Sequence, residues 1–347
     1  MRFLDSLLIA ASVLSSSLGS AALNITVLRP DLPIVPQNLP PPNAATDCDK
    51  IVELFQNLGR TTVWDLIEKV QFEGETWEPE GIVRLGDDRY FVSAGEYISP
   101  TVKFANHSII DGTDRTTGAG FAHIIVFDGK GNRIADATLT ERGAIEYHNG
   151  GLDYDGEFIW AAISQYRPNS TSTVVRIDPR TLEPTSILRT DDHEGGIVHD
   201  TANNNIVTLN WGARNASTWN LHHKFAELPL FTPPDSVARN PSYFVDYQDC
   251  KFLGHPRAYN KRGVMLCSGA ATVGPYNLGG IALVDLETMN PLAEVPITML
   301  TDLGVTMTQN PVEVAVVDGK LRLYWLPDQH NSTLYVYEAQ VDSPYQY

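Results

Sequence analysis

From Thr61 onward the chain alternates short apolar runs with tight polar turns. The runs are rich in Val, Ile, Tyr, Phe, Trp and Thr, and Gly, Asp, Asn or Pro residues separate them. Many short strands at near-regular spacing are typical of an all-β sandwich, barrel or propeller. The clearest expected strands are Arg89 to Ala94, His123 to Phe127, Glu157 to Ala162, Thr173 to Ile177, Asn205 to Trp211, Gly280 to Val284, Leu321 to Leu326 and Thr333 to Tyr337.

A weak internal repeat favours the propeller among these architectures. A polar cluster precedes an apolar strand position five times, and a tight turn and a second strand follow most copies. Segments 177–184 and 284–292 also resemble each other as strand, Asp, turn and strand. Four strands in each repeating unit define a propeller blade. The five copies of the cluster begin at Trp77, Tyr147, Asp192, Tyr247 and Gln309.

The expected fold class is therefore an all-β propeller of five blades. Six blades remain an alternative if the long segment 212–246 contains a degenerate unit. The last unit, ending at Tyr337 to Gln340, is one strand short, and the strand-like run Thr61 to Phe72 precedes the first unit. Pairing these two runs would close the ring and cover both exposed edges, as an all-β protein requires.

The N-terminal region predicts a leader, an arm and a helix before the propeller. Residues 1–22 have a short positive start, an apolar middle and a small-residue end, the pattern of a secretory signal peptide. Residues 23–60 follow as a proline-rich extended arm and one short helix over 46–58, where apolar residues have helical spacing. Residues 61–347 are then expected to form a single propeller domain.

Glycosylation sequons agree with secretion. The pattern Asn-x-Ser/Thr without proline in the middle marks N-glycan acceptors in secreted proteins. Together with the leader, the sequons predict a secreted glycoprotein. They begin at Asn24, Asn106, Asn169, Asn215 and Asn331.

Composition and charge exclude several functions. The chain has 347 residues, of which 43% are hydrophobic and 19% charged, as in a folded globule. A net charge of -17 argues against nucleic acid and anionic membrane surfaces, which both attract Lys and Arg. No later stretch is long enough to span a membrane. A nucleophile elbow, a phosphate loop and a dinucleotide fingerprint are absent from the sequence, and no cofactor is expected.

The three cysteines leave two interpretations open. If Gly254 pairs with Gly263 in a hairpin, Cys250 faces Cys267, either as a cross-strand disulfide or as two buried thiols. Cys48 is then single, or it tethers the N-terminal arm.

The repeat also carries candidate chemistry. The position four before each strand residue is polar in all five copies, and we term these residues the polar column. Innermost propeller strands begin next to the central channel, so the polar column should form a ring around a pocket mouth. A solvated channel lining without a ligand is the alternative interpretation. The polar column consists of Glu78, His148, His193, Gln248 and Asn310.

Three chemistries are compatible with this ring. Hard oxygen ligands for calcium would come from Glu78, Glu80, Asn149, Glu194 and Asp249, and the two histidines would suit zinc. In acid–base catalysis, His148 and His193 would titrate near neutral pH with Glu194 or Glu78 as the tuning carboxylate. In shaped binding, Trp77, Tyr147, Tyr247 and Trp211 would form the apolar walls.

We predict an acid–base site without a resident metal. The expected catalytic residues are His148, His193 and Glu194. The expected substrate-binding residues are Trp77, Glu78, Glu80, Tyr147, Asn149, Tyr247, Gln248, Asp249, Gln309 and Asn310.

The layout of the chain resembles a known family. The leader, the sequons, the proline-rich arm and a degenerate propeller opening with Trp77-Glu-Pro-Glu-Gly-Ile82 are similar to secreted fungal proteins that include the hetero-Diels–Alderases of tropolone–sesquiterpenoid biosynthesis. The resemblance extends over the whole mature chain. It implies a cofactor-free pericyclase of secondary metabolism with tropolone-type and terpene-type small molecules as partners. A hydroxymethyl tropolone would lose water to give an o-quinone methide, which would add to an alkene of a humulene-type sesquiterpene.

Two other classes of function remain open from the sequence. One is a metal-dependent propeller hydrolase similar to the gluconolactonase type. The other is a secreted propeller that binds a ligand without turnover.

Overall fold

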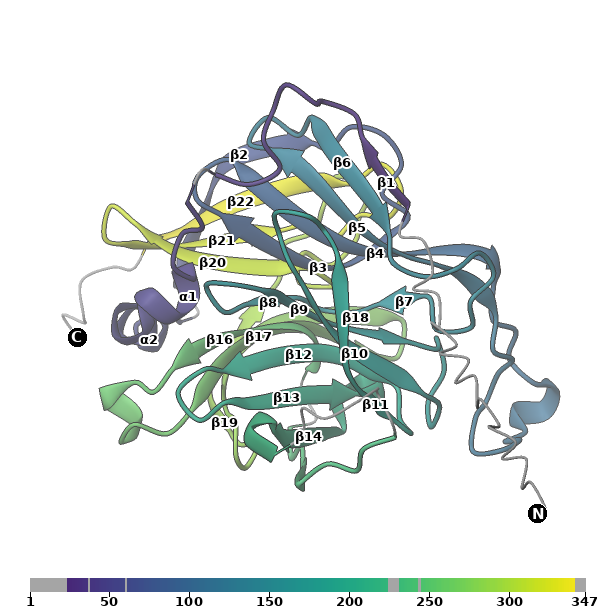
Figure 1. The fold of residues 1–347 in the computed structure, drawn as a ribbon. Coiled ribbons are helices and arrows are strands. Elements are labelled where there is room, and N and C mark those ends of the chain that lie inside the picture. Colours follow the sequence, from purple (N-terminus) through teal and green to yellow (C-terminus); the bar gives the residue numbers. More distant parts are fainter. Residues whose placement is uncertain (1–23, 37, 60, 224–230, 243–244, 341–347) are drawn as a thin grey trace, which may run out of the picture.

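The computed structural model describes residues 24–36, 38–59, 61–223, 231–242 and 245–340. These residues form an all-β ring of five sheets around a central axis (Figure 1), so the predicted five-bladed propeller is confirmed. The predicted signal peptide, residues 1–22, lies outside the described residues. Within the described residues, no helix is long and apolar enough to cross a membrane.

Each blade is an antiparallel sheet whose innermost strand begins at a copy of the repeat. Blade 1 contains β3 (Glu78–Leu85), β4 (Arg89–Ser99), β5 (Ala119–Asp128) and β6 (Arg133–Thr138). Blade 2 contains β7 (His148–Asn149), β8 (Asp153–Tyr154), β9 (Ile159–Ser164), β10 (Ser172–Ile177) and β11 (Pro184–Thr190). Blade 3 contains β12 (Glu194–Asp200), β13 (Asn205–Asn210), β14 (Asn215–Asn220) and β15 (Ser236–Arg239).

The remaining blades follow the same plan. Blade 4 contains β16 (Asp246–Gly254), β17 (Val264–Val273), β18 (Tyr276–Asp285) and β19 (Pro291–Ile297). Blade 5 contains β20 (Val312–Val317), β21 (Lys320–Trp325), β22 (Thr333–Gln340) and β2 (Val63–Gln71). Short 3-10 helices lie in the connections: η1 (Ala105–His107), η2 (Trp211–Ala213), η3 (Leu221–His223) and η4 (Arg257–Tyr259).

The antiparallel order gives the ring two distinct faces. Every innermost strand begins at one end of the ring, which we term the cavity face. The turns between second and third strands lie at this same face. The turns between first and second strands, and between third and fourth strands, lie at the other end, the closed face.

Strand β2 closes the ring as predicted. It pairs with β22 along its length, from Val63 opposite Gln340 to Gln71 opposite Thr333. The chain that precedes blade 1 thus supplies the outermost strand of blade 5, and both sheet edges at the junction become paired.

Segment 212–246 does not form a sixth blade. Where the structure describes it, this segment contains β14 and β15, which pair with each other and complete blade 3. The apolar core is divided in the same fivefold way. One buried cluster fills each interface between neighbouring blades, because successive side chains of a strand point to opposite faces of its sheet.

The N-terminal arm is more ordered than an extended tail. Strand β1 (Asn24–Val27) pairs with β6 at the outer edge of blade 1. The proline-rich segment then crosses the closed face, where the carbonyls of Pro33 and Pro40 accept hydrogen bonds from Arg89 and Tyr154.

Two helices complete the cover of the closed face. The helix expected over 46–58 is α2 (Cys48–Gln56), and a further short helix, α1 (Asn43–Thr46), precedes it with a non-helical Asp47 between them. Helix α2 packs its apolar face into the core between blades 4 and 5. Figure 1 shows both helices on the side of the ring away from β7.

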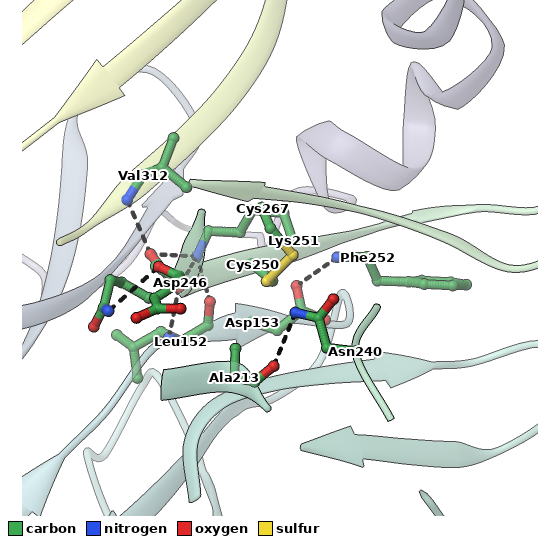
Figure 2. Close-up of a disulfide and its surroundings, with 12 residues drawn as sticks. Leu152, Asp153, Ala213, Asn240, Asp246, Cys250, Lys251, Phe252, Cys267 and Val312 are labelled. Atoms are coloured by element: carbon green, nitrogen blue, oxygen red, sulfur yellow. Dashed lines mark hydrogen bonds and ion pairs between the residues drawn. A yellow bond between two sulfur atoms is a disulfide. The ribbon is translucent and has the colours of Figure 1, made fainter. Parts of the chain in front are cut away.

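The disulfide alternative is correct for the cysteine pair. Cys250 on β16 and Cys267 on β17 are bonded and lie directly opposite each other (Figure 2). Gly254 pairs with Val264 instead of Gly263, because the register shifts after Phe252. Cys48 keeps a free thiol, and burial raises its pKa to about 11.

Candidate functional site

A cavity of about 240 Å³ lies on the axis at the cavity face. Its lining comes from all five blades, mainly where innermost strands begin and second strands end. The volume is below the roughly 300–1,000 Å³ of pockets for drug-sized ligands, so the cavity suits a small molecule. The lining residues are Glu78, Glu80, His148, Tyr166, His193, Gly195, Asn210, Trp211, Gly212, Tyr247, Gln248, Gln309 and Asn310.

The structure brings the whole polar column together around this cavity. Each of its five residues comes from a different blade. Glycines of the repeat make the convergence possible. A Cβ atom on Gly81 would lie 2.4 Å from the backbone nitrogen of Leu152, and one on Gly150 would lie 2.2 Å from the carbonyl oxygen of Gly195. The innermost strands can approach the axis this closely only without side chains at these positions.

Glu78, Glu80 and His148 form one cluster of titratable side chains in the cavity. The Nε2 atom of His148 lies 3.4 Å from Oε1 of Glu80. Burial alone would lower the pKa of His148, but the charges of Glu80 and Glu78 outweigh burial and raise it. Burial and the neighbouring Glu80 raise the pKa of Glu78 to about 7. The Oε1 atom of Glu78 accepts a hydrogen bond of 2.8 Å from Gln329.

His193 lies beside His148, and its pKa is shifted in the opposite direction. The two imidazole centroids are 5.1 Å apart. Burial, followed by the charge of His148, lowers the pKa of His193 to about 3. Its Nδ1 atom lies 2.7 Å from the carbonyl oxygen of Gln165, which can only accept, so Nδ1 carries the hydrogen. Nε2 of His193 therefore carries a lone pair and acts as an acceptor at neutral pH.

Two aromatic rings form one wall of the cavity. Tyr166 and Trp211 contact each other at 5.4 Å between centroids, and Trp211 also contacts His193 at 4.8 Å. The guanidinium of Arg115, from the long loop between β4 and β5, lies 4.6 Å from the centroid of Trp211. This wall offers flat apolar surface for a planar ligand.

Three predicted site residues from blades 1 and 2 lie outside the cavity lining. Trp77 has a positive φ of 50° and stacks on His123 at 3.9 Å instead. Tyr147 is fully buried, and Asn149 donates a hydrogen bond of 2.7 Å to the carbonyl of His123. Tyr147 and Asn149 support blade 2 against blade 1, whereas Trp77 packs against the core between blades 1 and 5.

Glu194, predicted as catalytic, is also absent from the cavity lining. Its side chain is completely buried behind the lining. Burial, with a smaller contribution from Asp192, raises its pKa to about 8. Glu194 is therefore protonated and neutral at neutral pH, and it does not supply the tuning charge that the sequence suggested.

Asp249, expected to bind substrate, instead forms an ion pair on the axis behind the cavity. Its carboxylate accepts hydrogen bonds from the buried ammonium of Lys251 at 2.8 and 2.9 Å. It also accepts from the backbone N–H groups of Leu152 at 3.1 Å and Val312 at 3.0 Å, with Ile82 more distant at 3.4 Å. One side chain thus connects blades 1, 2, 4 and 5, and we term the pair the axial hub. Figure 2 shows Leu152, Lys251 and Val312 grouped beside the disulfide.

The donor set does not favour a metal site. Among the described residues, no three His, Cys, Asp or Glu side chains converge in a way that could hold a metal ion. Of the expected calcium ligands, Glu78 and Glu80 face the cavity, whereas Asn149, Glu194 and Asp249 do not. The hydrolase alternative therefore has no structural observation in its favour.

Besides Gly195 and Gly212, sequence reasoning missed two lining residues that have side chains, Tyr166 and Asn210. Tyr166 lies just after β9, the second strand of blade 2, in the dipeptide Gln165-Tyr166. Asn210 is the last residue of β13, the second strand of blade 3, in the dipeptide Asn210-Trp211. Extending the repeat comparison past the second strand would have revealed this polar–aromatic pair.

Comparisons with known proteins give the family of this chain. Among solved structures, a hypothetical protein from Leishmania major has a TM-score of 0.39 and 12% identity, over 81% of this chain and 92% of that chain. A DUF4623 family protein from Bacteroides eggerthii has a TM-score of 0.39 and 10% identity, over 77% of this chain and 60% of that chain. No curated protein matches the sequence significantly. Residues 40–343 match the model of a family of unknown function, DUF6454, and this propeller protein belongs to that family.

Proposed function

We propose that the cavity is an active site in which a small, oxygen-rich molecule undergoes acid–base chemistry. The observation that carries this proposal is the separation of three neighbouring protonation states. The pKa of Glu78 is about 7, the pKa of His148 is raised, and the pKa of His193 is about 3. Surroundings that move the pKa values of neighbouring groups apart are typical of sites where each group has its own role in proton transfer.

Each group suits a different role. Glu78 suits the proton donor, because a group with a pKa near the working pH can both deliver and recover a proton. His193 suits the acceptor of a substrate hydroxyl through its free Nε2 lone pair. His148, protonated beside Glu80, places a positive charge where negative charge develops on a substrate oxygen.

Elimination of water is the reaction that fits these roles. Glu78 delivers its proton to a leaving hydroxyl as the carbon–oxygen bond breaks. A second hydroxyl of the substrate gives its proton to Nε2 of His193, and the electrons of that bond form the new conjugated carbonyl system. The proton on His193 then returns to the Glu78 carboxylate, which is the stronger base of the two.

Within this class we propose the substrate that the sequence resemblance implies, a hydroxymethyl tropolone. Tyr166 and Trp211 support this choice because aromatic side chains bind planar rings. The amides of Gln248 and Asn310 can donate to the tropolone oxygens. A cavity of about 240 Å³ suits one ring, so the humulene-type alkene is expected to approach the o-quinone methide from the open side. Holding the two partners in one orientation is itself a source of rate enhancement.

The test is adduct formation from a hydroxymethyl tropolone and a humulene-type alkene, compared with the spontaneous background. Glu78→Gln and His193→Ala should each slow the reaction by roughly 10²–10⁴, the usual span for loss of general acid–base catalysis. The rate should also depend on pH with an inflection near 7, which Glu78→Gln should remove. Glu141→Gln, at an exposed residue outside the cavity, is the matched control.

The possible outcomes test the tropolone substrate and the acid–base site separately. No acceleration by the wild-type protein would refute the tropolone assignment. Calorimetric binding of tropone, which has no ionisable hydroxyl, tests the acid–base site by itself, because its affinity should change across pH 7 in the wild type and remain flat in Glu78→Gln. A flat profile in the wild type would refute the role of Glu78, and pH-dependent binding without turnover would identify a ligand-binding propeller.

A further inference from the structure

All five sequons lie at the cavity face. Asn106, Asn169 and Asn331 lie in the connections between the second and third strands of blades 1, 2 and 5. Asn215 begins the third strand of blade 3. Asn24 begins β1 and pairs with Thr138, where the last strand of blade 1 returns to this face.

The closed face has asparagine-containing turns without sequons. Asn132, Asn203, Asn204, Asn260 and Asn290 all lie in turns between first and second or third and fourth strands. Ser or Thr does not occur two residues after any of them. A lack of asparagines in the turns of the closed face therefore does not explain why the sequons lie at the cavity face. The closed face is covered by the arm, α1 and α2, whereas the cavity face carries every acceptor.

The acceptor side chains are accessible to a glycan. Four of the five asparagines are exposed, and Asn215 is half-buried. The loop between β4 and β5 contains Asn106 and contacts Asn169. Asn169 donates a hydrogen bond of 2.6 Å to Gly112 of this loop, and Arg115 of the same loop lies over Trp211. A glycosylated amide keeps one N–H group, so the bond to Gly112 is compatible with modification.

We propose that N-linked glycans form a fence around the cavity mouth. Glycans are bulky and hydrated, and several of them around one opening would admit small molecules and keep proteins and polysaccharides out. The substrate is then a free small molecule and not part of a polymer or a carrier protein. This inference deepens the proposed function, because it rests on the cavity being the substrate site.

Occupancy of the sequons is the first measurement. The full chain, produced with its own leader by a eukaryotic secretory host, should yield glycopeptides at the cavity-face asparagines in mass spectrometry. Unmodified Asn106 and Asn169 in the secreted protein would overturn the fence, because these two belong to or contact the loop that places Arg115 over Trp211 of the cavity wall.

Access to the cavity is the second measurement. Gln309→Cys, in a Cys48→Ser background, places a thiol in the cavity lining, and Glu157→Cys places one in an exposed turn of the closed face. A small maleimide should label both variants. A maleimide on a long polyethylene glycol should label Glu157→Cys readily, but Gln309→Cys several-fold faster after enzymatic removal of the glycans than before.

Equal labelling of Gln309→Cys by the large reagent before and after glycan removal would overturn the inference. Gln248→Cys repeats the test at another lining residue if the first variant is not secreted. Labelling requires no catalysis, so this result is independent of the tropolone assay. Failure of the fence and failure of the proposed reaction are therefore distinguishable.

Discussion

Replacing Asp249 by asparagine should lower the free energy of unfolding by about 3–5 kcal/mol, the usual cost of removing one partner of a buried ion pair. The carboxylate is fully buried, and the side chain of Lys251 is only 2% exposed. The backbone N–H groups of Leu152 and Val312 donate to different oxygens of Asp249, so asparagine can accept from only one of them. The variant also leaves the ammonium of Lys251 without its hydrogen-bonded counter-charge, so the loss of stability combines a missing charge with a missing hydrogen bond.

The expected change is large enough to measure in two ways. At about 2 °C per kcal/mol, the lower end for large domains, the melting temperature should fall by about 6–10 °C. Urea unfolding followed by tryptophan fluorescence should show the same loss, since the chain contains 6 tryptophans.

A second substitution isolates the ion pair from the hydrogen bonds. Lys251→Met removes the ammonium, and the double variant with Asp249→Asn is neutral at both positions. The double variant should lose less stability than the two single variants added together, by more than 1 kcal/mol, as expected for residues in direct contact. Additive losses, or an Asp249→Asn variant within 1 kcal/mol of the wild type, would refute the ion pair as the element that connects the blades.

Three further predictions concern the rest of the ring. Burial raises the pKa of Glu194 from 4.5 to about 8, so between these pH values the folded state holds a proton that the unfolded state releases. The free energy of unfolding should therefore fall as the pH rises from about 4.5 to about 8. Glu194→Gln should flatten this dependence of the melting temperature on pH. Removing residues 23–72 should cause aggregation, because β22 becomes an open edge, and a soluble truncated protein of unchanged melting temperature would contradict ring closure by β2. Gly150→Ala should destabilise strongly, because its Cβ would lie 2.2 Å from backbone, whereas the nearest atom to a Cβ at Gly196 is in the flexible Leu209 side chain at 3.3 Å and the nearest backbone atom is at 3.6 Å. Similar urea midpoints for Gly150→Ala and Gly196→Ala would contradict the close approach at the axis.

The fold could be predicted from the sequence because the sequence patterns that indicate its strands and turns are local. Alternating apolar runs, turn residues and the repeated polar cluster lie within short windows, and they gave the blade count and the closure by β2. The facing of Cys250 and Cys267 followed from a hairpin register of the same kind. The pairing of β1 with β6 had no comparable signal, because four residues at a sheet edge carry little periodicity.

The site could be predicted only in part, because its lining depends on β-bulges and on contacts between blades. The register shifts at Pro79/Gly81, Glu194/Gly196 and Tyr247/Asp249, near the start of three innermost strands. A bulge changes which side chains face inward, and Gln248 lines the cavity whereas its neighbour Asp249 lies behind it. The pKa shifts are equally non-local, because the carboxylate that raises the pKa of His148 belongs to Glu80 of another blade.

In the described part of the chain, the axial hub and the covered closed face obstruct the axis behind the cavity. Asp249 and Lys251 fill the axis there with paired charges, and the arm and helices lie beyond them. If the cavity is the proposed active site, substrate and product use the opening at the cavity face in turn, and the next substrate can enter only after the product has left. Product inhibition of any reaction in this cavity should accordingly be competitive with substrate, and slow departure of a bulky product would limit the turnover rate even if the chemical step were fast.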